Sequence, residues 1–280
     1  MISSRQLLFN FGRGGSQMRK SIAYIVVIDL AFILAAAISA TVSGWAHDVV
    51  YYGLYAALIA VASAFAARDD AGLRLSALPQ KPAQALVLFA PSMLLIIGMS
   101  FVVSSLLLLL GKSDTVDVSG ALLPQLLRHA LLPAVFEEML FRYVPIRLLG
   151  GRSRRAAIIV SSLMFALVHM SLFRIPYALI AGVIFAYMTV ATGSVLPSML
   201  LHFANNAASV MWMRDPDTAP YIILISLAVL TILSAVYIAI RRGDYLKSIK
   251  EAFSGEKIGF SFEITVAAVL CLGAAFLELR

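Results

Sequence analysis

The sequence predicts an all-α fold, a polytopic transmembrane helix bundle of eight helices, from its composition, its long apolar stretches and its charge distribution. Hydrophobic residues make up 61% of the 280 residues and charged residues only 13%. A soluble domain is roughly 45–50% apolar and about 25% charged. Because a water-facing fold of this size cannot bury so much apolar surface, the composition predicts one integral membrane domain over residues 1–280.

Eight stretches are long and apolar enough to be read as membrane-spanning helices, each of which needs about 20 residues. They cover residues 22–40, 50–67, 85–110, 121–149, 156–172, 175–192, 195–213 and 220–240. A ninth candidate, 264–277, is short, and the sequence leaves open whether it spans the bilayer or lies in its interface. The polar segment 241–261 is predicted to be a basic cytosolic connector.

The basic residues are concentrated in alternate loops. With the N-terminus in the cytosol, four precede the first stretch, three follow the second, four lie at the inner end of the fourth or just after it, and five follow the eighth. These sixteen outnumber the three in external loops, which is the usual bias of membrane proteins. The pattern predicts a multi-pass protein of the plasma membrane with a cytosolic N-terminus and the lipid bilayer as its partner. It also accounts for the net charge of +7 without nucleic acid.

The fourth stretch carries charged residues where lipid is expected, in the run Phe136-Glu137-Glu138-Met139-Leu140-Phe141-Arg142. Charges inside a membrane span are costly and mark functional sites or structural ion pairs. Glu138 and Arg142 are four residues apart on one helix face and can form an ion pair. Glu137 lies about 100° round the helix from Glu138 and faces a different neighbour.

Two further stretches carry His169, His202 and Asn206, and the last two share a helix face. With a rise of about 1.5 Å per residue, these groups and Glu137 are expected in one layer, between mid-membrane and its inner half. A carboxylate or imidazole can take a proton from water, and an imidazole and an amide can stabilise an oxyanion. The set is therefore typical of a hydrolytic site, with a purely structural ion-pair cluster as the alternative.

Metal binding is a weaker interpretation of the same residues. His169, His202 and Glu137 could hold zinc with a water molecule as the fourth ligand. The usual His-Glu-x-x-His motif is absent, and the single Cys271 excludes a multi-cysteine site. We therefore expect no cofactor, with zinc as the alternative.

Three motifs, Glu137-Glu138-x-x-x-Arg142, Phe165-x-x-x-His169 and His202-x-x-x-Asn206, together resemble the signature of the CPBP (Abi) family. This family contains the type II CAAX prenyl endopeptidases and bacterial bacteriocin-processing relatives. The resemblance covers about residues 120–210 in detail and indicates a catalytic core at about 121–213.

The resemblance implies an eight-helix bundle with a cavity open toward the cytosol. It implies that Glu137, with His169, activates a water molecule that attacks the scissile carbonyl. His202 and Asn206 then stabilise the oxyanion, and Glu138 and Arg142 orient the site. Early descriptions called the family metalloproteases, but a metal-free glutamate mechanism suits these residues better.

The resulting hypothesis is an intramembrane endopeptidase that acts on a membrane-associated peptide or protein, either prenylated or bearing a leader peptide. One rival is a non-enzymatic membrane regulator or immunity protein, because the family includes such members. Another is a transporter that uses the carboxylate pair for proton coupling, which predicts inverted repeats that the sequence does not show.

Overall fold

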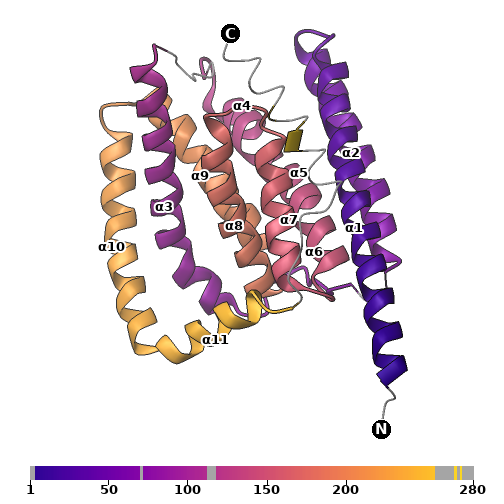
Figure 1. Ribbon diagram of the computed structural model, residues 1–280. Coiled ribbons are helices and arrows are strands. Elements are labelled where there is room, and N and C mark those ends of the chain that lie inside the picture. Colours follow the sequence, from indigo (N-terminus) through magenta and orange to yellow (C-terminus); the bar gives the residue numbers. More distant parts are fainter. Residues whose placement is uncertain (1–3, 70–71, 112–117, 256–267, 270–271, 273–280) are drawn as a thin grey trace.

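The computed structural model describes residues 4–69, 72–111, 118–255, 268, 269 and 272, and in this part of the chain every regular element is a helix (Figure 1). The all-α prediction is thereby confirmed for the described residues. The long helices run side by side as a bundle, with α1 and α2 along one edge and α3 and α10 along the other (Figure 1). The ninth candidate span, 264–277, and Cys271 lie outside the described residues, apart from three isolated positions.

Five helices, α2, α3, α8, α9 and α10, follow predicted apolar stretches closely, but α1 begins at Ser4 rather than near residue 22, and the predicted connector 241–261 contains helix α11. The helix bounds are α1 Ser4–Ser39, α2 Trp45–Ala67, α3 Pro82–Leu109, α7 Arg154–Leu167, α8 Arg174–Thr192, α9 Leu196–Arg214, α10 Ala219–Ile240 and α11 Arg242–Ala252. Proline lies in the first turn of α3, α9 and α10, where its missing N–H costs no helical hydrogen bond. Gly193 ends α8 in the left-handed conformation with φ 69°, which glycine adopts without steric cost.

The predicted helix 121–149 is not one regular helix. It consists of α4 Leu122–Leu126, the π-helical segment η1 Leu127–Leu131, α5 Leu132–Glu138, the π-helical segment η2 Met139–Tyr143 and α6 Val144–Leu149. Each π-helical segment ends just before a proline, Pro133 or Pro145, which cannot donate a backbone hydrogen bond. The Glu137-Glu138 pair therefore ends a short α-helical segment between two wider turns.

Side chains from neighbouring helices satisfy the carbonyl groups near these prolines. The Ser161 hydroxyl of α7 donates to the carbonyl oxygen of Phe141, four residues before Pro145. The Tyr52 hydroxyl of α2 donates to the carbonyl oxygen of Arg128, five residues before Pro133, at 3.2 Å. The Phe141 carbonyl is buried and requires such a partner, and the two bonds join the interrupted helix to α7 and α2.

The predicted helix 156–172 is shorter than expected. Helix α7 ends at Leu167, and Met170 has a positive φ of 45°, a conformation that no continuing α-helix contains. His169 thus lies in the turn just after α7. The side chain of His169 therefore extends from a turn at the end of α7, whereas the sequence predicted that His169 would lie within the helix.

Five described helices are long and apolar enough to cross a membrane, and the predicted count of eight is not confirmed. They are Gln17–Ser39, Ala46–Ala67, Pro82–Leu109, Arg174–Thr192 and Ala219–Ile240. The other three predicted spans are those that carry the motifs. Stretch 121–149 is divided, α7 has only 14 residues, and α9 includes His202, Asn205 and Asn206. Because of these polar residues and short segments, none of the three has the continuous apolar length of about 20 residues that a membrane span needs.

Helix α8 packs between α7 and α9 in the interior of the bundle. Gly182 allows α7 and α8 to approach closely, because a Cβ atom there would lie 3.0 Å from Cα of Ser162. Aromatic side chains join α1 and α2 to the interrupted helix. Phe32 of α1 lies 4.7 Å from Tyr55 of α2 and 5.6 Å from Phe141, measured between ring centroids.

The loops gather at two ends of the bundle. At one, which we name the basic end, Arg152 binds Asp69 at 2.7 Å and the N–H of Leu73 donates to the carbonyl of Arg147. The basic end also holds these Lys and Arg residues of the loops and of α11: Arg68, Arg74, Lys81, Arg154, Arg155, Arg241, Arg242, Lys247 and Lys250. At the opposite end Arg128 lies 3.2 Å from Asp48, and Arg214 donates to the carbonyl of Val118.

Candidate active site

The predicted ion pair of the interrupted helix is present. Nε of Arg142 lies 3.3 Å from Oε2 of Glu138, and both side chains are 0% exposed. The pair crosses from α5 into η2, so the wider π-helical turn lies between its two members. Taking both charges out of water is costly, and the guanidinium nitrogens of Arg142 form no hydrogen bond with any residue that the structure describes.

His202 of α9 lies between the two carboxylates. Its Nδ1 is 3.0 Å from Oε1 of Glu138, and its Nε2 is 3.9 Å from Oε2 of Glu137. A carboxylate accepts hydrogen bonds, so Nδ1 carries the proton and donates it to Glu138. This bond sets the tautomer and directs Nε2 toward Glu137. Two adjacent carboxylates thus bind opposite sides of one imidazole ring.

The two glutamates differ in exposure. The side chain of Glu138 is 0% exposed, whereas that of Glu137 is 22% exposed. Glu138 has a guanidinium and an imidazole as partners, and Glu137 contacts only the far nitrogen of His202 among the described ion pairs. Of the two carboxylates, Glu137 is therefore the more exposed.

Two phenylalanines enclose Arg142 and His202. The guanidinium carbon of Arg142 lies 4.0 Å from the ring centroid of Phe165 in α7 and 5.2 Å from that of Phe185 in α8. Phe185 also stacks on the imidazole of His202, with ring centroids 5.0 Å apart and planes 16° apart. A desolvated cation over an aromatic face gains about 2 kcal/mol. These rings therefore hold Arg142 and His202 in fixed positions.

His169 reaches the same group through Phe165. Its Nδ1 donates to the carbonyl oxygen of Phe165 at 2.7 Å. Its ring lies 4.9 Å from the Phe165 ring, which in turn lies 6.0 Å from the ring of His202. Since Nδ1 is occupied by the backbone, Nε2 is the basic atom of neutral His169. No described contact joins His169 directly to Glu137.

Asn206 belongs to a hydrogen-bonded chain whose other members the motifs did not indicate. Nδ2 of Asn205 donates to Oδ1 of Asn206 at 3.2 Å and to the hydroxyl of Tyr177 in α8 at 2.9 Å. Because Oδ1 of Asn206 is engaged as an acceptor, its Nδ2 group is the side that can donate to a ligand. Asn205 could have been noticed as a second amide beside Asn206, but Tyr177 lies in an apolar helix without such a signal.

The structure thus brings Glu137, Glu138, Arg142 and His202 into direct contact, with His169 one aromatic ring away. Among the described contacts, the side chain of Asn206 is bonded to Asn205, which also bonds Tyr177 of α8, and it contacts neither glutamate. The two described pockets lie at the two ends of the bundle, and none of the predicted catalytic residues lines them.

The residues that the structure describes include no group of three or more His, Cys, Asp or Glu side chains arranged to bind a metal ion. Arg142 lies beside Glu138, and its guanidinium would repel a divalent cation at that carboxylate. Nδ1 of His202 donates to Glu138 while its Nε2 faces Glu137, an arrangement that metal-ligating histidines also show.

Comparison with known proteins connects this site to a family. Residues 119–208 match the family model described as Type II CAAX prenyl endopeptidase Rce1-like. The match covers about a third of the chain and contains all three motifs, which confirms the resemblance to the CPBP family. No curated protein and no solved structure matches the chain at a significant level. Together with the apolar helices, the match indicates an integral membrane protein of the peptidase class.

Proposed function

We propose that the chain is a metal-free intramembrane endopeptidase that uses Glu137 to activate water. The observation that carries this proposal is the position of His202 between Glu137 and Glu138, at 3.9 and 3.0 Å. One carboxylate orients the imidazole, and the other remains partly exposed. A general base must lie where it can reach the proton that it takes from water, and Glu137 is the more exposed of the two carboxylates.

The mechanism assigns each group one task. Glu137, assisted by Nε2 of His169, takes a proton from a water molecule as the oxygen attacks the scissile carbonyl. His202 in its protonated form and Nδ2 of Asn206 donate to the oxyanion that develops. Glu138 stabilises the imidazolium of His202, and Arg142 compensates the charge of Glu138. The proton on Glu137 then passes to the leaving amine, which completes hydrolysis.

The substrate is proposed to be a peptide held at the membrane, and a prenylated peptide is the first probe because the matched family model is named for that activity. A peptide with a leader segment is the second. We further propose that the chain crosses the plasma membrane eight times with its N-terminus in the cytosol. The collection of basic loops at one end of the bundle supports this orientation.

The direct test compares the cleavage of a farnesylated peptide by purified wild type and by Glu137→Gln. A second comparison uses mass spectrometry to identify the peptides that each protein releases from membranes. Glutamine keeps the shape of glutamate but cannot accept the proton, and a general base contributes about 10²–10⁴-fold. We expect cleavage to fall by that factor while the melting temperature stays unchanged. Equal turnover in the two proteins would refute the assignment, and a chelator should have no effect on wild type.

A further inference from the structure

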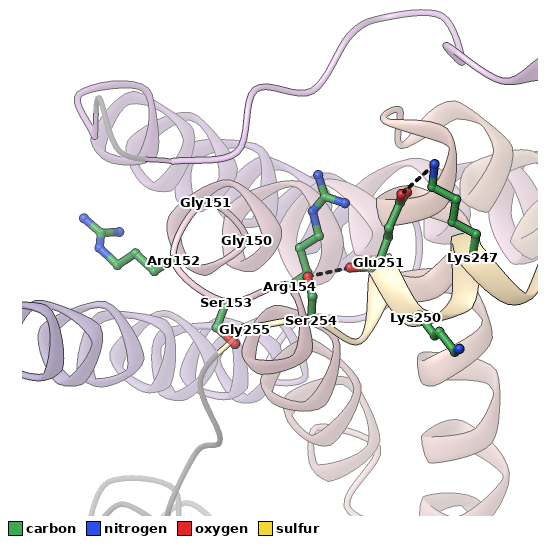
Figure 2. A pocket seen from close by; sticks show the side chains of 10 residues that line it. All are labelled: Gly150, Gly151, Arg152, Ser153, Arg154, Lys247, Lys250, Glu251, Ser254 and Gly255. Atoms are coloured by element: carbon green, nitrogen blue, oxygen red, sulfur yellow. Dashed lines mark hydrogen bonds and ion pairs between the residues drawn. The ribbon is translucent and has the colours of Figure 1, made fainter. Parts of the chain in front are cut away.

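The charged residues around the pocket at the basic end do not converge on one point. This pocket has a volume of about 630 Å³ and lies between the α6–α7 turn and helix α11. In Figure 2 the charged ends of Arg154 and Lys250 point apart. The carboxylate of Glu251 already lies between Arg154 and Lys247. A polar group that the proposed mechanism leaves unused lies instead on helix α2, near Glu137.

This group is the hydroxyl of Tyr55. Tyr55 is 1% exposed, and its hydroxyl forms no hydrogen bond with any residue that the structure describes. Its ring packs against Phe32 of α1 and Phe136 of α5, with centroid distances of 4.7 and 5.4 Å. A phenylalanine would suit this apolar setting better, because a buried hydroxyl without a partner lowers the stability of the folded protein.

The acceptor that this hydroxyl can serve is the carboxylate of Glu137. Phe136, on which the ring of Tyr55 packs, directly precedes Glu137 in α5. Among charged side chains, Glu137 has the strongest electrostatic effect on the Tyr55 hydroxyl. Glu137 forms no hydrogen bond within the described part of the chain, since Nε2 of His202 at 3.9 Å is too distant to donate one. A hydroxyl without an acceptor and a carboxylate without a donor therefore lie near each other in the interior.

The other polar groups near Tyr55 fit this pairing less well. Glu138 already has a guanidinium and an imidazole as partners. The hydroxyl of Tyr52, which also interacts electrostatically with Glu137, is engaged by a backbone carbonyl at 3.2 Å. Asp29 of α1 is the rival acceptor, because its Oδ2 atom is buried and has no hydrogen-bond partner among the described residues. Its electrostatic effect on Tyr55 is nevertheless weaker than that of Glu137.

We propose that Tyr55 is a positioning residue of the active site, whose hydroxyl donates a hydrogen bond to one carboxylate oxygen of Glu137 when a substrate is bound. In the proposed mechanism His202 donates to the oxyanion, so Glu137 then needs a different donor. The bond from Tyr55 directs the other carboxylate oxygen toward the water molecule. It also favours the ionised form of Glu137 beside Glu138, which is the form that accepts a proton. This inference rests on the proposed function, because it requires Glu137 to be the base.

The test compares the cleavage of the farnesylated peptide by wild type and by Tyr55→Phe over a range of pH. We expect kcat to fall about tenfold with little change in KM, because a hydrogen bond to a charged group contributes about that factor or more. The acidic limb of the kcat profile should move upward by about one pH unit, since a carboxylate that loses a donor is protonated at higher pH. The melting temperature should stay the same or rise, because the change removes a buried hydroxyl without a partner.

Two tyrosines provide matched variants. Tyr187 of α8 has the other buried tyrosine hydroxyl without a partner among the described residues, and its ring stacks on Phe253 at a centroid distance of 6.3 Å. Tyr187→Phe should therefore leave kcat, KM and the pH profile unchanged. Tyr51 lies 5.8 Å from Tyr55 between ring centroids and is the rival donor, but it is only half-buried. Tyr51→Phe should lower kcat less than Tyr55→Phe does.

Several outcomes would overturn the inference. If Tyr55→Phe has the kcat and pH profile of wild type while Glu137→Gln is inactive, Tyr55 has no task in the site and the proposed function stands. A larger loss in Tyr51→Phe would make that residue the donor. If Tyr55→Phe and Asp29→Asn both melt below wild type with kcat unchanged, the hydroxyl serves Asp29. Equal turnover in Glu137→Gln and wild type would instead remove the proposed function, and this inference with it.

Discussion

At the scale of single residues, Asn205 sets the orientation of the side-chain amide of Asn206. Nδ2 of Asn205 holds Oδ1 of Asn206 at 3.2 Å and also bonds the hydroxyl of Tyr177 at 2.9 Å. Without Asn205, the amide of Asn206 can rotate and direct its oxygen toward the oxyanion, which would repel it. Asn205 is therefore a positioning residue in the proposed mechanism, since it acts through its neighbour.

We expect Asn205→Leu to lower kcat about tenfold with little change in KM, less than the 10²–10³-fold that loss of an oxyanion donor costs. Tyr177→Phe keeps the bond between the two asparagines and should have a smaller effect. Steady-state kinetics on the farnesylated peptide would separate the two parameters. A change in KM alone, or a larger effect of Tyr177→Phe, would contradict this role.

The ion pair of Glu138 with Arg142 should determine the stability of the folded protein, whereas Glu137 should have little effect on it. Glu138 and Arg142 are 0% exposed, and removal of one partner leaves the other charge buried, at about 3–5 kcal/mol. Arg142→Ala and Glu138→Ala should therefore melt well below wild type in one detergent, whereas Glu137→Gln should not. Glu138→Gln/Arg142→Met should regain part of the loss, because methionine packs well between the rings of Phe165 and Phe185.

That double variant should still lack full activity, since Glu138 also orients His202. The roles would be reversed if Glu137→Gln were the destabilised protein and Arg142→Ala melted like wild type.

At the scale of elements, one hydroxyl of α7 adds a hydrogen bond to the aromatic packing between α7 and η2. Ser161 donates to the carbonyl of Phe141, which Pro145 leaves without its helical donor. Its neighbour Ser162 is equally buried but bonds the carbonyl of Ile158 within its own helix at 2.6 Å. Loss of the first bond strands a buried carbonyl, which costs about 1–3 kcal/mol, whereas the second carbonyl keeps its helical partner.

Ser161→Ala should therefore lower the melting temperature and also weaken catalysis, because η2 carries Arg142. Ser162→Ala is the matched control and should be close to wild type in both. Equal melting of the two variants would show that the bond across helices adds nothing.

The sequence could predict the elements wherever apolar length decided them. α2, α3, α8 and α10 follow their stretches, and the spacing of Glu138 and Arg142 predicted their pairing. It could not predict the π-helical segments, since an extra residue in a turn leaves the apolar run uninterrupted. The hydrogen-bonded chain behind Asn206 was missed because Tyr177 reaches Asn205 through the packing of α8 against α9, which no local sequence pattern records.

At the scale of the whole molecule, charge separates the two ends of the bundle. Arg152 with Asp69, and Arg155 with Phe253, bring segments distant in sequence to the basic end. The opposite end has the acidic residues Asp48 and Asp215 beside its few arginines. A bundle whose helices alternate in direction and whose basic loops share one end has a single preferred orientation in the membrane.

Reporter fusions test this orientation. A reporter after Arg155 or after Lys250 should read as cytosolic, and one inserted at Thr115, which lies outside the described residues, should read as external. The reason is that sixteen basic residues occur on one side and three on the other, and basic segments near span ends are retained in the cytosol.

Removing basic residues should weaken this orientation. Replacing Arg152, Arg154 and Arg155 with glutamine should reduce the cytosolic fraction of the first fusion, whereas replacing arginine with lysine within 241–250 keeps the charge and should not. If Thr115 reads as cytosolic while Lys250 reads as external, the helix directions are inverted. Glu137 and His202 would then still face each other, because that contact belongs to the fold, but the substrate would have to be sought on the other side of the membrane.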